Sequence, residues 1–251
     1  MRRPALALFL LFLLFVSFGA ASAQDGVRTS LNAAVAAKEL QSHFGKLAQA
    51  KETPDYGKPP VSKLFLEVFN TPALLKLGPP KAQDLNWLVE WLGVASSTYQ
   101  IVLNFGALPG EQPNAAVERN IARFEDEASR AMEFLVRMTP RVANSGAAFM
   151  DGLSEKERSQ PARQKGFAQM RAGLIQTVSG CITFTGAGPK PGNARLLSAA
   201  LRDTVNEWIR FAQADDRTRL MGLLAQARTN VKDEQVSADL LEVSKVLAAA
   251  K

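Results

Sequence analysis

Two side chains in this sequence could serve as a nucleophile and its base, the thiol of Cys181 and the imidazole of His43. The chain has 251 residues, with one cysteine and one histidine. An imidazole that takes the thiol proton would create a reactive thiolate. However, the neighbours of Cys181 are small or apolar, as in a packed helix interior. We therefore expect Cys181 to be a buried thiol, with an intermolecular disulfide as the alternative, and His43 to be partly exposed.

A single histidine excludes several classes of site. A zinc site needs several His, Cys or carboxylate ligands, and the di-iron centres of helical bundles need two histidines. Covalent haem requires a Cys-x-x-Cys-His run, which the sequence lacks. A serine triad would have to use His43, and no Gly-x-Ser-x-Gly elbow is present. The sequence therefore predicts no catalytic residue, no metal and no cofactor.

Carboxylates are numerous in one segment, at Glu118, Glu125, Asp126, Glu127 and Glu133. A glycosidase needs two carboxylates on either side of a cleft. In this segment the acids mostly share a helix face with arginines, which is typical of a solvated surface. A carboxylate-dependent hydrolase is therefore kept only as a lesser alternative.

Three aromatic residues, Trp87, Trp91 and Tyr99, lie near one stripe of the helix expected for residues 81–105. Such a stripe can line an apolar ligand pocket, or it can belong to the core. Both interpretations stay open, and the three residues are the candidate ligand-binding residues of the chain.

Three glycines, Gly166, Gly173 and Gly180, recur every seven residues in the helix expected for residues 162–185. Glycines inside a helix cost about 1 kcal/mol each relative to alanine, so something should offset them. We interpret the three as helix-packing residues that let another backbone approach closely. The alternative is a coincidence of spacing.

Apolar residues elsewhere repeat at intervals of three and four, and no segment shows the alternation of a β-strand. The clearest helix is expected at residues 114–138, and further helices are expected over 29–50, 194–212, 216–230 and 234–249. Segments 91–110 and 172–189 contain no charged residue, which indicates two central helices covered on most sides. The sequence thus predicts an all-α fold, an irregular multi-helix bundle of about seven to nine helices, as a single domain over residues 24–251.

The first 23 residues have the order of a cleavable signal peptide. Arg2 and Arg3 precede an apolar run of about 14 residues, and Ala21-Ser22-Ala23 forms a small-x-small cleavage site before Gln24. A membrane-spanning helix needs roughly 20 residues, so a retained anchor is the lesser alternative. We expect cleavage between Ala23 and Gln24, export to the periplasm or secretion, and no stable membrane span after cleavage.

The net charge and the cysteine content of the chain indicate which partners and which compartment to expect. Loss of the two leader arginines leaves 28 basic and 24 acidic residues, a net charge of +4. This small excess does not indicate a nucleic-acid binder. One cysteine permits no intrachain disulfide, and the chain has no Asn-x-Ser/Thr site. Both features favour a bacterial periplasm over eukaryotic secretion.

These observations favour an exported, non-catalytic helical protein that binds a partner protein or the cell envelope in the periplasm. The alternatives are a carrier of an apolar small molecule near Trp87, Trp91 and Tyr99, and the hydrolase. A filled core with an exposed apolar patch would favour the partner binder. A closed apolar cavity would favour the carrier, and a cleft with two facing carboxylates the hydrolase.

Overall fold

The computed structural model of the chain describes residues 24–107 and 110–250, and the predicted signal peptide lies outside this part. The described residues form eleven α-helices, two 3-10 helices and no strand. The α-helices are α1 Gln24–Ala50, α2 Val61–Val68, α3 Thr71–Lys76, α4 Leu85–Leu103, α5 Pro113–Arg123, α6 Glu125–Asp151, α7 Glu155–Arg158, α8 Pro161–Gly186, α9 Pro191–Trp208, α10 Ala214–Asn230 and α11 Glu234–Ala249. The 3-10 helices are η1 Ala82–Asp84 and η2 Ile209–Phe211. All but α3 and α7 have eight residues or more, and the predicted all-α bundle is confirmed.

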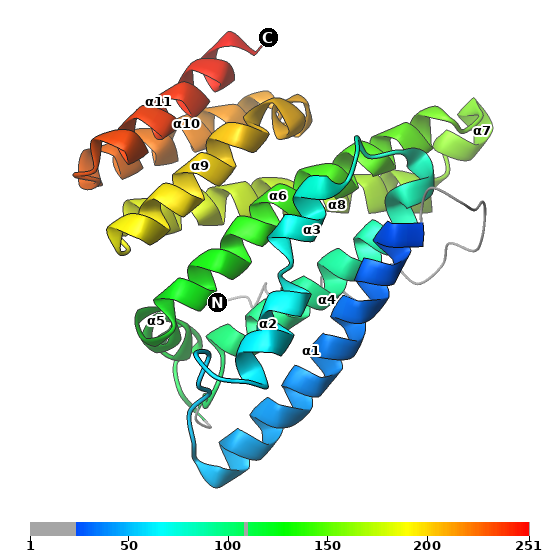
Figure 1. Cartoon of the computed structure of the whole chain (residues 1–251). Coiled ribbons are helices and arrows are strands. Elements are labelled where there is room, and N and C mark those ends of the chain that lie inside the picture. Colours follow the sequence, from blue (N-terminus) through cyan, green and yellow to red (C-terminus); the bar gives the residue numbers. More distant parts are fainter. Residues whose placement is uncertain (1–23, 108–109, 251) are drawn as a thin grey trace.

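Helix α6 lies between two groups of helices. On one side it packs with α1 to α4 in a first hydrophobic core, and on the other with α8 to α11 in a second core. Figure 1 shows α6 crossing the molecule between these groups. Fourteen of the 27 residues of α6 are buried, among them small ones such as Ala131 and Gly146. Small side chains let neighbouring helices approach, which suits a helix that is covered on several sides.

The two uncharged segments, which were expected to be central helices covered on most sides, lie in α4 and α8, and both helices pack against α6. Both α4 and α8 keep one row of uncharged side chains exposed, including Ser97 and Gln100 on α4 and Gln176 and Thr183 on α8. An exposed serine or threonine hydroxyl group in a helix can form a hydrogen bond without a partner from another helix, because it donates to the backbone carbonyl oxygen one turn earlier. Thr177 does so toward Gly173 in α8, with an oxygen–oxygen distance of 2.9 Å. A helix face without charge therefore does not have to be buried.

The helix predicted over residues 114–138 is two helices. Helix α5 ends at Arg123 and α6 begins at Glu125. Phe124 between them has a non-helical backbone and is buried against Tyr56, with 5.2 Å between ring centroids. The first turn of α6 is acidic throughout, which favours a helix start because carboxylates stabilise the free N–H groups there. The apolar residues keep the same spacing through α5 and α6, so the sequence pattern did not show that a second helix begins at Glu125.

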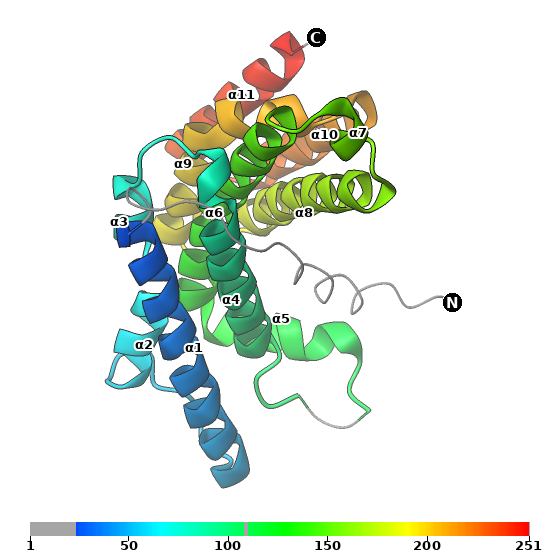
Figure 2. The same ribbon diagram turned by 90° about the vertical axis from the view of Figure 1, so that its right-hand side faces the viewer.

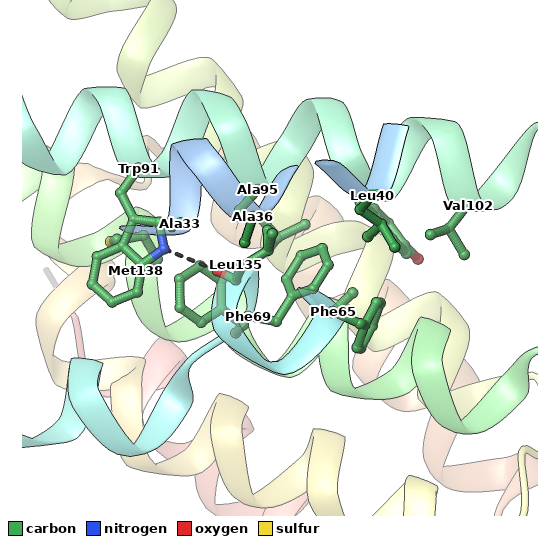
Figure 3. Close-up of a cluster of buried hydrophobic side chains, with 14 of the residues drawn as sticks. Ala33, Ala36, Leu40, Phe65, Phe69, Trp91, Ala95, Val102, Leu135 and Met138 are labelled. Carbon is green, nitrogen blue, oxygen red and sulfur yellow. Dashed lines mark hydrogen bonds between the residues drawn. The ribbon is translucent and has the colours of Figure 1, made fainter. Parts of the chain in front are cut away.

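Aromatic side chains fill the first core (Figure 3). Trp91 is fully buried, and its indole N–H donates to the carbonyl of Val68 at 2.9 Å. The Trp91 ring also packs on Phe134 of α6, with 5.1 Å between centroids. This one side chain thus joins α4 to the end of α2 and to α6.

Candidate functional site

The structure places in the first core all three aromatic residues for which a ligand pocket and a core position were both left open. Trp91 and Tyr99 are both buried in the first core, and burial raises the pKa of the Tyr99 hydroxyl. Trp87 belongs to the same core, and it also lines a cleft. The stripe is therefore part of the core, with Trp91 between Val68 and Phe134 and Trp87 against Gly26.

Trp87 forms part of the floor of a cleft of about 690 Å³. The cleft lies between the N-terminal turns of α1, the connection from α3 to η1, and the start of α4. The indole N–H donates to Oδ1 of Asp84 at 3.3 Å. The ring also lies directly against the backbone of Gly26, where an added Cβ would be 2.7 Å from it. Only glycine at position 26 permits this contact.

The connection that forms one wall of the cleft is held by two polar side chains. Arg141 of α6 donates to the carbonyl oxygens of Gly78 and Leu77, at 2.9 and 3.3 Å. The other carboxylate oxygen of Asp84 accepts from the backbone N–H of Lys81 at 2.9 Å. The Arg141 guanidinium and the Asp84 carboxylate thus bind the backbone of this wall rather than a ligand.

The remaining charged groups of the cleft are of both signs. The basic ones are Arg28, Lys76 and Lys81, and none of them forms an ion pair with a described residue. The acidic ones are Asp25, which is exposed, and Glu67, which is partly exposed. The cleft therefore has charged groups of both signs beside its apolar residues, unlike the closed apolar cavity that a carrier of an apolar molecule would need.

The acidic residues give little support to the interpretation of the protein as a carboxylate-dependent hydrolase. Such an enzyme separates the pKa values of two neighbouring carboxyl groups, usually by burying one of them. Burial raises the pKa of Glu207, but Glu207 does not line the cleft. Among the described residues, no group of three or more His, Cys, Asp or Glu side chains could hold a metal ion.

Cys181 and His43 lie in different parts of the molecule. Cys181 is completely buried in the second core, where its thiol lies 4.0 Å from the carbonyl oxygen of Leu197. Burial raises the pKa of this thiol to about 12. His43 is partly exposed on α1, which packs in the first core. The structure thus gives the thiol no base and an unreactive protonated state.

Two of the three α8 glycines predicted to pack closely, Gly173 and Gly180, have no backbone close to them. Gly166 and Gly173 are partly exposed, and a Cβ built on Gly173 meets no atom within 4 Å. At Gly180 the nearest atom, the methyl of Met132, lies at an ordinary 3.8 Å. The close approach occurs instead at Gly186, where an added Cβ would lie 2.8 Å from the Cα of Ala227 in α10. At Gly173 and Gly180 the seven-residue spacing therefore does not mark a close approach of another helix.

The large apolar side chains that are exposed in the described structure all belong to three helices, α1, α2 and α3. They are Val27 at 38%, Leu31 at 53% and Val35 at 59% on α1, Leu66 at 51% on α2, and Leu75 at 56% on α3. We call these five residues the apolar face. Helices α1 and α2 pack against each other on the side of the molecule opposite α10 and α11, whereas α3 lies against α6 (Figures 1 and 2).

Sequence reasoning missed the apolar face although part of it was visible. Val27, Leu31 and Val35 repeat every four residues, which places them in one row of a helix. A second apolar row on the same helix, with Leu40 and Phe44, is the one that is buried.

Within residues 24–107 and 110–250, no helix combines the length and the apolar character of a membrane span.

Comparison of the chain with known proteins finds no family model, no curated protein and no solved structure that matches it.

Proposed function

We propose that this is an exported, non-catalytic helical protein that binds a partner protein or the cell envelope in the periplasm. The contact is made by the side of the molecule that α1, α2 and α3 form. The observation that carries the proposal is the apolar face, since it holds all the large exposed apolar side chains of the described residues. Single exposed apolar side chains are ordinary, but their restriction to three of the helices supports an interaction site on these helices.

The filled interior supports binding at the surface rather than carriage inside. Both cores are packed with side chains, and the three aromatic residues considered for a carrier pocket, Trp87, Trp91 and Tyr99, are part of the first core. The cleft beside Trp87 is lined by charged groups. An apolar small molecule would gain little there, because the charged groups would lose water on binding.

The energy of the apolar face by itself is modest. Covering the exposed half of a leucine or valine contributes about 1 kcal/mol, so the five residues together contribute roughly 5 kcal/mol. Association costs at least about 4 kcal/mol in lost freedom of motion. A stable complex therefore requires further contacts beside the apolar face, and these have to come from polar or charged groups.

Photo-crosslinking in cells tests the proposal. The full chain is expressed with its own N-terminal segment and with a photoreactive amino acid at position 31 or position 66. A matched variant carries the same group at Gln226, an exposed residue of α10 on the other side of the molecule. We expect covalent adducts in the envelope fraction from positions 31 and 66 and none from position 226. The absence of adducts at 31 and 66 would contradict the proposal.

A further inference from the structure

We infer that residues 70–81 form a strap that opens and closes the cleft beside Trp87 while the rest of the protein stays folded, with Arg141 as its latch. The strap consists of Asn70, α3 and the connection from α3 to η1. Eight of its twelve residues line the cleft, and the first turns of α1 form the opposite wall. Movement of the strap therefore changes the width of the cleft.

Both ends of the strap are fixed to the first core. Just before it, the indole N–H of the buried Trp91 donates to the carbonyl oxygen of Val68 at 2.9 Å. At its far end, the buried hydroxyl of Ser145 on α6 donates to the carbonyl oxygen of Lys81, and Asp84 accepts the N–H of the same residue. The residues between these points can therefore move without displacing α2 or α4.

Between its ends the strap has few anchors. Leu74 is its only buried residue, and six of its twelve residues are exposed. The polar anchors are the Thr71 hydroxyl, which donates to Glu133 at 2.9 Å, and the two hydrogen bonds from Arg141 to the backbone of the connection. A segment with so little buried apolar surface opens at a lower free energy than the core helices do.

The charged groups that hold the strap keep oppositely charged neighbours when it opens. The second carboxylate oxygen of Glu133 accepts from Nε of Arg137 at 2.7 Å, so the buried charge of Glu133 stays paired. Burial raises the pKa of Glu207 on α9, and the charge of Arg141 opposes this rise, so Arg141 also has an acidic neighbour outside the strap. Opening therefore avoids the large cost of leaving a buried charge without a partner.

Hydrogen exchange of the full chain, followed peptide by peptide by mass spectrometry, tests the inference. We expect the amides of residues 73–77 to exchange at least about 100-fold faster than those of the buried middle of α6, residues 134–143. Low concentrations of urea should hardly change the rate in the strap, because local opening exposes little surface, but should raise the rate in α6. Equal protection of both segments, with the same dependence on urea, would overturn the inference.

A pair of arginine variants tests the latch. Arg141→Met removes the hydrogen bonds to Leu77 and Gly78, and we expect the exchange of residues 73–76 to become about tenfold faster, although Arg141 donates to none of them. The control is Arg195→Met, which removes an ion pair between α9 and Asp233 and should leave the exchange of the strap unchanged. An unchanged rate in Arg141→Met, or an equal increase in both variants, would mean that Arg141 is not the latch.

A variant of the second core distinguishes local opening from unfolding of the whole protein. Val243 of α11 is completely buried there, and Val243→Ala leaves a cavity. We expect exchange in α9 and α11 to become at least about tenfold faster, because their amides exchange through global unfolding. The exchange of residues 73–77 should stay at the wild-type rate, since the strap opens while the second core is intact. An increase of the same size in the strap would show that only global unfolding releases it, and the inference would then be wrong.

Discussion

Gly186 at the end of α8 lies directly against Ala227 of α10, so that a methyl group on Gly186 would be 2.8 Å from both the Cα and the Cβ of Ala227. Asn230 strengthens the same junction, since its side-chain amide donates to the carbonyl of Gly186 at 3.2 Å. This contact fixes how closely α8 and α10 pack in the second core.

Gly186→Ala should therefore destabilise the protein. The added methyl would have to push α10 away from α8, and such overpacking costs about 1–3 kcal/mol. Urea unfolding followed by circular dichroism measures the loss. A variant as stable as wild type would mean that the two helices can separate without cost at this point.

Gly173→Ala should have the opposite sign. The position is partly exposed and helical, and an added Cβ meets nothing within 4 Å. Alanine is favoured over glycine in a helix, so the gain should be up to about 1 kcal/mol. The same unfolding experiment, run beside Gly186→Ala, compares two glycines of one helix. A loss of stability at position 173 would restore the packing interpretation of the glycine spacing.

The substitution Arg137→Met, which removes the guanidinium group, should destabilise the junction of α3, α6 and α9. Its Nε donates to Glu133 at 2.7 Å and its Nη2 to Asp203 of α9 at 3.0 Å, while Thr71 of α3 donates to the other Glu133 oxygen. Glu133 is buried, so Arg137→Met leaves a buried charge without its partner, at a cost of about 3 kcal/mol.

The double variant Arg137→Met with Glu133→Met controls for the unpaired charge. It replaces both ions by apolar groups and should recover much of the lost stability, because no buried charge remains. Chemical denaturation of the single and double variants makes the comparison. Equal losses in both would show that packing around Arg137, rather than charge pairing, is the source of the effect.

Cys181 should be unreactive in the folded protein. Its thiol is completely buried with a pKa raised to about 12, so near pH 8 it is almost entirely protonated. Ellman's reagent should label no thiol in the native protein and one thiol per chain in urea. Rapid labelling of the native protein would contradict the buried position.

Export should produce a chain that begins at Gln24. The basic start, the apolar run and Ala21-Ser22-Ala23 together predict cleavage after Ala23. N-terminal sequencing and intact mass of the exported protein check this. An exported product that retains Met1 would favour the anchor instead.

The sequence by itself determined the helices of the C-terminal half. The helix predicted over residues 162–185 is α8, Pro161–Gly186, and the one over residues 234–249 coincides with α11, Glu234–Ala249. Apolar periodicity, proline at helix starts and side-chain caps are local features, and they act within one or two turns. The burial expected of Cys181 is confirmed for the same reason, since its apolar neighbours already indicated a core position.

Only the tertiary structure decided which faces are covered. Helix α1 has two apolar rows, one with Leu40 and Phe44 and one with Leu31 and Val35, and packing against α2 and α4 buries the first and leaves the second exposed. In the same way Trp87 and Trp91 are both core residues, but only the neighbours of Trp87 form a cleft beside it. Periodicity defines a face of a helix but not its partner, because the partner comes from residues distant in the chain. The candidate binding face therefore became visible only once the neighbours of α1 were known.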